Sequence, residues 1–267
     1  MSNSKSLKSN SELDEDLDLL EATLEDTLNG LEEGTLLSQA ADVPHLQAYQ
    51  ALKKRRQRFY QTNPKPKENY HHGDLATALI DAAIEMIEEK GAASLSLRGI
   101  ARSAGVSQAA PYRHFKDKDA LITAVAVKGF TLLLYELWDG LHDSLSPWEQ
   151  ILALSQGYLK FTQEHTAYFK VMFGPEINSS DPDFQASQQE AITLFIDAIL
   201  AGQEIQTFRD DSPADIQALA IWSLLHGFSS LTIYEQIQIE GLSITAPNIL
   251  VNALMCLLYQ GTQPQRS

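Results

Sequence analysis

The side chains able to bind an anion are concentrated in one block of an otherwise acidic chain. The 267 residues carry a net charge of −15. Residues 53–118 hold 13 basic and seven acidic side chains, whereas residues 1–52 hold two and 11, and residues 119–267 hold five and 17. An acidic surface repels nucleic acid, but a local basic block indicates a local anionic partner.

Residues suited to catalysis or metal binding show no comparable grouping. The seven histidines are scattered, and the adjacent pair His71 and His72 is a weak metal signal. We find no Cys/His cluster, no phosphate-binding glycine loop and no spaced set of nucleophile and base. The sequence therefore predicts no enzyme activity, no cofactor and no metal.

Cysteine usage and hydropathy indicate a cytoplasmic protein. The single cysteine, Cys256, cannot form an internal disulfide, which favours a reducing compartment. The N-terminus is polar and acidic, unlike a signal peptide. The apolar run 249–259 is far shorter than the roughly 20 residues of a membrane helix. We therefore expect no membrane association.

The elements that must position the basic side chains are short helices. A helix over 74–90, started by Asp74 and stopped by Gly91, has an apolar face at helical spacing. After it, Ser96 can cap a short helix that runs to Ala104. Gly105 then supplies a turn that needs a positive φ angle.

A second short helix follows the turn. Val106 is expected to fill the angle between the two helices, and Ser107 to cap a helix that begins at Gln108. Two short helices joined by a glycine-containing turn form a helix-turn-helix motif, whose second helix enters the DNA major groove. Pro111 lies in this helix. It loses no hydrogen bond if Gln108 is the cap, and one first-turn bond if Ser107 is the cap.

The segment Tyr70–Leu121 resembles the DNA-binding domain of TetR-type transcription regulators. The resemblance covers about 60 residues, and its matching positions are Ile100-Ala101, Ala104-Gly105-Val106-Ser107, Tyr112, His114-Phe115, Lys118 and Leu121. It implies an all-α chain, with a three-helix helix-turn-helix domain followed by a helical ligand-binding and dimerisation domain. The expected divisions are an extension at 1–69, the DNA-binding domain at 73–133 with its motif at 96–115, and the second domain at 134–263.

The resemblance also implies roles for individual side chains. Ser96 and Arg98 would contact phosphate or a groove edge, and Gln108 and Ala109 would face bases. Glutamine can pair with adenine through two hydrogen bonds. The remaining predicted DNA contacts, mainly to phosphates, are Arg102, Ser107, Tyr112, Arg113, His114 and Lys118. His71 and His72 would cap the first helix or touch the DNA backbone.

The rest of the chain is predicted to be helical. The expected helices run over 118–141, from Ser146-Pro147 through Phe161, and over 166–173, 184–207, 213–240 and 246–259. The stretches 164–175 and 222–227 resemble the C-terminal domain class named for its Trp-His-Gly signature. That resemblance implies a homodimer formed through residues 213–240 and 246–259.

A small-molecule pocket is expected in the second domain, because the resemblance implies coupling of an effector to DNA release. Its candidate lining residues are Tyr158, Phe161, Met172, Phe173, Phe195, Trp222 and His226. Aromatic residues at helical spacing also form plain hydrophobic core, and His226 also fits a hydrogen-bonded core histidine. The sequence leaves the effector and the operator unidentified.

Two features precede the DNA-binding domain. Leucines at 13, 17, 20, 24, 28 and 31 form one stripe of an acidic amphipathic helix, which would pack on its own domain or its dimer mate, bind a partner or inhibit DNA binding. The remaining alternative for this segment is disorder. The basic run 53–58 is either solvated surface or an arm that follows phosphates. We therefore predict a DNA-binding regulator that acts as a repressor; the alternative is a protein-interaction module on the same fold, with the acidic helix as autoinhibitor or partner-binding segment.

Overall fold

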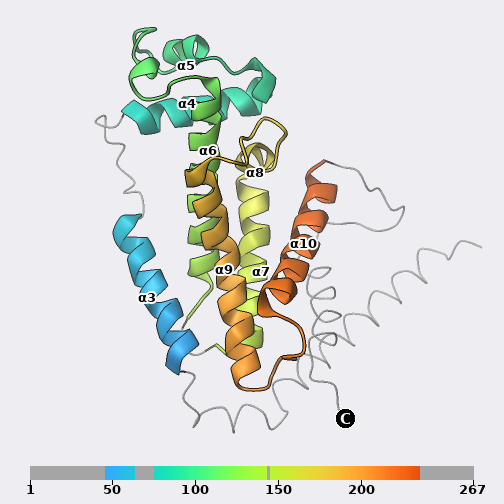
Figure 1. The fold of residues 1–267 in the computed structure, drawn as a ribbon. Helices are drawn as coiled ribbons and strands as arrows, with labels where there is room; N and C mark the ends of the chain where they lie inside the picture. The colour runs from blue at the N-terminus through green and yellow to red at the C-terminus, as the bar shows by residue number, and fades with distance from the viewer. Residues whose placement is uncertain (1–45, 64–74, 143–144, 235–267) are drawn as a thin grey trace, which may run out of the picture.

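The described part of the chain is built only from helices (Figure 1). The structure is a computed structural model that describes residues 46–63, 75–142 and 145–234. The helices are α3 (Leu46–Thr62), α4 (Leu75–Lys90), η2 (Ala92–Ser94), α5 (Leu97–Ser103), η3 (Pro111–Arg113), α6 (Lys118–Asp139), α7 (Pro147–Glu164), α8 (Thr166–Met172), α9 (Pro182–Glu204) and α10 (Ala214–Ile233). The predicted all-α class is confirmed. The leucine stripe, His71, His72, Asp74 and the predicted helix 246–259 lie outside the described residues.

Helix α6 connects the two parts of the molecule. Its first turns lie against the small head formed by α4 and α5, and the rest runs down the bundle of α7, α8 and α9 (Figure 1). Its buried side chains include Leu133, Leu137 and Trp138, none of which is measurably exposed. Any shift of α6 in the bundle therefore moves the head as well.

The helix ends follow from local hydrogen bonds. Ser146 Oγ accepts from Glu149 N at 3.3 Å, and the Glu149 carboxylate accepts from Ser146 N at 2.6 Å, which confirms the predicted cap of α7. Helix α9 begins two residues before the predicted Phe184, because Asp181 caps it. It ends at Glu204, three residues before the predicted Thr207. The chain reverses there so that the Phe208 ring packs on Gly202.

Two helices, α6 and α10, are long and apolar enough to cross a membrane by length and composition alone. Helix α6 is the central helix of the bundle, and more than half of its most apolar stretch is buried inside the protein. Its apolar composition is therefore explained by core packing.

Helix α3 contains the basic run 53–58, and it packs beside α9. Phe59 is 1% exposed, and the Tyr135 hydroxyl of α6 donates to Asn63 O at 2.8 Å. Arg55 Nε lies 3.2 Å from Asp197 Oδ2 of α9, and Arg56 Nη1 donates to Leu141 O at 2.7 Å. These two arginines thus make contacts within the protein. Neither a solvated surface nor a free arm that binds DNA phosphates describes them.

The contact between α3 and α9 includes a half-buried ion pair. Burial raises the pKa of the Asp197 carboxyl, and the charge and hydrogen bond of Arg55 partly offset this increase. Arg55 therefore stabilises the ionised form of Asp197, and its contribution to folding depends on pH.

Replacing Arg55 by alanine is expected to lower the free energy of unfolding by an amount that increases with pH. The substitution raises the pKa of Asp197 in the folded state further. At low pH, Asp197 is protonated with or without Arg55, so the loss is small. Above the folded-state pKa, the variant holds an unpaired carboxylate. Denaturant unfolding at about pH 4 and about pH 7 measures the difference.

The matched control is Arg58→Ala, which removes an exposed arginine from the same helix. This substitution should change the free energy of unfolding little at either pH. If Arg55→Ala lowers the free energy of unfolding equally at both pH values, Arg55 does not stabilise the ionised form of Asp197.

Candidate DNA-binding interface

Helix α5 is fixed at its start by a side-chain cap and along one face by burial. Ser96 Oγ accepts from Gly99 N at 3.1 Å, as the sequence predicts. Leu97, Ile100 and Ala101 are buried, and Arg98 and Arg102 are exposed on the outer side. The two arginines are therefore held on a rigid helix and face solvent.

Gly105 ends α5 in the left-handed region, with φ of 68°. Gly105 N donates to Arg102 O at 3.2 Å, and Val106 N donates to Ala101 O at 2.9 Å. This pair of bonds is the Schellman arrangement, which satisfies the last carbonyls of a helix. Val106 packs partly buried against the core. Both the positive φ and the position of Val106 confirm the sequence prediction.

The segment after the turn differs from the predicted helix. Ala110 N donates to Ser107 O, Arg113 N to Ala110 O and His114 N to Pro111 O, at 2.9–3.1 Å. These three-residue spacings define a tight 3₁₀ path, in which only Pro111–Arg113 forms a regular helix.

The prediction that Gln108 or Ser107 caps this helix is wrong. Ala110 is the capping residue and makes no side-chain capping bond, and Pro111 is the first helical residue. Proline suits that position, because the first residue of a helix does not need its N–H and proline has a fixed φ.

Two buried residues anchor the segment after Gly105, and most of its other side chains face outward. Pro111 and Phe115 are buried, four residues apart. The exposed residues of the segment are Ser107, Gln108, Ala109, Tyr112, Arg113 and His114. Tyr112 is 53% exposed, so its ring and hydroxyl are accessible to another molecule.

Lys118 has a contact that the sequence did not predict. It is the first residue of α6, next to the cap Asp117, and its Nζ donates to Ala92 O at 3.2 Å. This bond ties the start of α6 to η2. An ammonium group has three donors, so a phosphate contact remains compatible with this structural one.

The charge of this surface suits a polyanion. Residues 96–118 contain five basic side chains and one acidic side chain, Asp117, whose carboxylate is used as a helix cap. Basic groups around an exposed hydrogen-bonding segment combine phosphate binding with access to base edges. The local charge therefore explains how an acidic protein can bind DNA.

Comparison with known proteins agrees with this geometry. Residues 79–125 match the family described as "Bacterial regulatory proteins, tetR family", and residues 151–247 match "Tetracyclin repressor-like, C-terminal domain". The chain belongs to the TetR family. It is a DNA-binding transcriptional regulator, and its family consists of soluble proteins in which dimerisation and a ligand-binding domain are typical.

The similar proteins include regulators from several bacteria. YobS of Bacillus subtilis, an uncharacterised helix-turn-helix transcriptional regulator, is 21% identical over 182 residues, which are 66% of this chain and 91% of YobS. A Rhodococcus sp. RHA1 protein of unknown function has a TM-score of 0.59 and 26% identity, over 73% of this chain and 99% of that one. The fatty acid degradation regulator FadR of Bacillus halodurans has a TM-score of 0.56 and 15% identity, over 72% of this chain and 95% of FadR.

In the second domain of this TetR-family protein, the predicted pocket residues form a packed aromatic cluster. Tyr158 OH lies 3.0 Å from His226 Nδ1, and the Trp222 ring packs 5.0 Å from Tyr158 and 5.8 Å from Phe195. Phe173 lies 4.4 Å from His226, while Phe161 and Met172 are buried in the same core. Burial lowers the pKa of His226 and raises that of Tyr158, so the pair is held as two neutral groups.

A cavity of about 230 Å³ lies beside this cluster, between α7 and α10. Its lining residues are Leu159, Thr162, Gln163, Thr166, Phe228, Ser229, Thr232 and Ile233. Ser229 Oγ is buried without a hydrogen-bond partner among the described residues. None of the predicted pocket residues lines this cavity. The sequence signal that could have located this cavity is the recurrence of hydroxyl side chains at helical spacing, at Thr162 and Thr166 and at Ser229 and Thr232.

The outer face of α10 is apolar and exposed. Ile216, Leu219, Leu231 and Tyr234 are 37–55% exposed. A Cβ atom on Gly227 would meet nothing within 4 Å in the described structure. A helix face of this kind is typical of a surface covered by another element or another subunit.

Replacing Gly105 by alanine is expected to destabilise the protein by roughly 1–2 kcal/mol, because an alanine at positive φ is strained. A Cβ atom there would meet nothing within 4 Å, so the cost is conformational and not a clash. Thermal or denaturant unfolding measures the change.

Asparagine is the matched control at the same position. It tolerates the left-handed region, so Gly105→Asn should retain more stability than Gly105→Ala. If the Gly105→Ala variant is as stable as the Gly105→Asn variant or the unaltered protein, the left-handed turn does not constrain this motif.

Proposed function

We propose that this regulator is a cytoplasmic repressor that binds its operator as a homodimer and releases it when a small effector binds. The observation that carries the DNA-binding part is the group of exposed side chains between Ser107 and His114, on a segment anchored by buried Pro111 and Phe115. We assign it to the major groove, with Gln108 and Ala109 facing bases and Tyr112, Arg113 and His114 facing phosphates or base edges. Ser96, Arg98, Arg102 and Lys118 supply further contacts to the DNA backbone.

The proposed dimer interface uses residues 213–240 and 246–259. The exposed apolar side chains of α10 support it, since an exposed apolar helix face is stabilised when a second copy covers it. Two heads in one dimer can then read two half-sites about one helical turn apart. We assign residues 73–133 to the head and 134–263 to the effector and dimerisation domain.

The proposed effector is small and uncharged. Every side chain that lines the cavity between α7 and α10 is neutral, and Ser229 offers a buried hydroxyl without a partner. A charged ligand would lose its hydration there without gaining a counter-charge. The packed cluster around Tyr158 and His226 is adjacent, so an effector that enlarges the cavity would repack residues of the predicted pocket.

Replacing Arg113 by alanine is expected to weaken operator binding and to lower the slope of log affinity against log salt concentration by about one. The side chain is exposed, so the fold should be preserved. The measurement is a fluorescence titration of DNA from the protein's own promoter region at several salt concentrations.

The control is Arg58→Ala, which removes an equal charge from α3. That helix packs beside α9, well away from the α4–α5 head (Figure 1). Affinity and salt slope should therefore match those of the unaltered protein. Equal losses in both variants would show that charge alone, and not the proposed surface, determines binding.

A further inference from the structure

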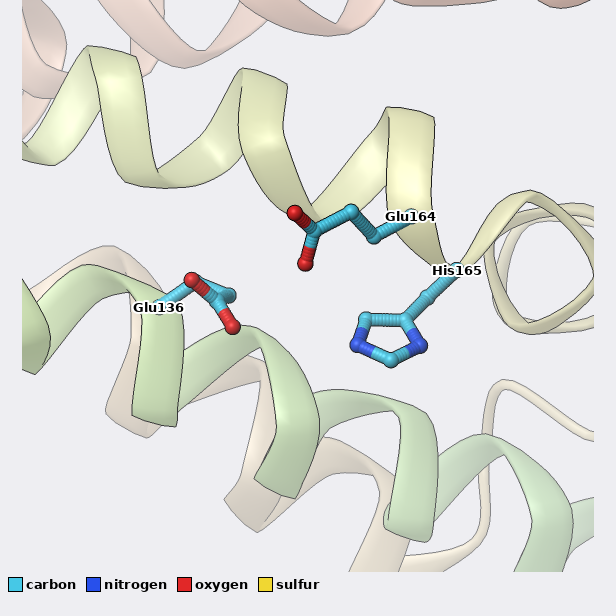
Figure 2. A group of neighbouring side chains, drawn as sticks. All are labelled: Glu136, Glu164 and His165. Atoms are coloured by element: carbon cyan, nitrogen blue, oxygen red, sulfur yellow. The ribbon is translucent and has the colours of Figure 1, made fainter.

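A second group of chemically competent side chains lies away from the DNA-binding head. Glu136 comes from α6, Glu164 is the last residue of α7, and His165 lies between α7 and α8. Each offers a ligand atom, and these atoms all lie within 4.8 Å of one another. Figure 2 shows the two carboxylates and the imidazole pointing toward a shared space between the helices.

The fold brings these groups together for identifiable reasons. A Cβ atom on Gly157 of α7 would lie 2.5 Å from Glu136 O, so only glycine allows α6 and α7 to approach this closely. His165 departs from helical geometry, with φ of −125° and ψ of 42°, and so ends α7. Its ring packs 5.5 Å from Phe161 and 6.2 Å from Tyr168, which restricts its orientation. The helix approach and the ring contacts therefore position Glu136 and His165 beside each other before any ligand binds.

A cation already interacts with this group. Lys160 Nζ lies 2.7 Å from Glu136 Oε2, and its side chain is half exposed. The hydrogen bond and charge of Glu136 raise the pKa of Lys160, and the charges of Glu164 and Asp139 add to this increase. One ammonium group thus faces three carboxylates. An exposed lysine is flexible and its ion pairs are weak, so it can move aside when a more highly charged ion arrives.

We propose that Glu136, Glu164 and His165 bind one divalent transition-metal ion of the Zn²⁺ class, which displaces Lys160 from Glu136. Imidazole nitrogen favours zinc, nickel or iron over magnesium and calcium, which prefer sites made only of oxygen ligands. Three protein ligands leave a coordination position for water, unlike the four-ligand sites that are purely structural. The ion would join α6 to the α7–α8 junction.

The test is a titration of the full-length chain with Zn²⁺ alone, in competition with a chromogenic chelator. We expect one site per chain that an equal concentration of Mg²⁺ does not occupy. Glu164→Gln, at an exposed position, should weaken binding at least about tenfold, which is the order of loss for altered metal surroundings. His165→Ala should do the same. Circular dichroism checks that both variants fold.

Lys160→Met separates this site from a simple ion pair. Removing the competing ammonium should tighten Zn²⁺ binding several-fold, whereas a lysine that merely organises the carboxylates would make binding weaker when it is lost. His142→Ala, at a histidine outside the group, is the matched control and should leave binding unchanged.

Two results would overturn the proposal. The first is Zn²⁺ affinity that is unchanged in both Glu164→Gln and His165→Ala, which would assign the ion to other residues such as His71 and His72. The second is a Lys160→Met variant that binds Zn²⁺ no more tightly than the unaltered protein. Neither measurement involves DNA, so the outcome is independent of the proposed repressor function.

Discussion

The geometry of the DNA-binding head depends on the left-handed turn at Gly105. This turn closes the hydrogen bonds at the end of α5 and directs the chain so that Pro111 and Phe115 reach the core of the head. The side chains between these anchors, Tyr112 to His114, face solvent, as do Ser107, Gln108 and Ala109 before them. A single backbone conformation, accessible to glycine at little cost, therefore determines which residues are available to DNA.

The head is joined to the second domain mainly through α6. Lys118 bonds to η2 at the start of this helix, and Lys128, further along, forms an ion pair with Asp81 of α4. The same helix is buried in the bundle by Leu133, Leu137 and Trp138. Because packed helices shift as units, a ligand that changes the packing of α7 to α10 can change the position of the head. A metal ion bridging Glu136 and His165 would act on the same helix.

Local signals in the sequence identified most of the head and its family. The Ser96 cap, the positive φ at Gly105 and the inward positions of Leu97 and Ile100 each depend on a few neighbouring residues, so they could be predicted. The 3₁₀ path around Pro111 could not, since helical and 3₁₀ hydrogen bonding share one residue pattern over so short a segment. The predicted contacts with DNA themselves stay predictions.

Long-range contacts account for what the sequence did not reveal. The basic run 53–58 was open to two interpretations, solvated surface or an arm for phosphate, and only the fold shows Arg55 beside Asp197, 142 residues later. Lys118 likewise meets a carbonyl 26 residues earlier. The grouping of Glu136 with Glu164 and His165 depends on the close approach of two helices at Gly157, and no sequence motif predicts it.

We expect the segment after Gly105 to contact DNA and helix α3 to make no contact with it. A photocrosslinking amino acid placed at position 109, and separately at position 58, tests it directly on operator DNA. A protein–DNA crosslink is expected from position 109 and none from position 58. A crosslink from position 58 with none from position 109 would contradict it.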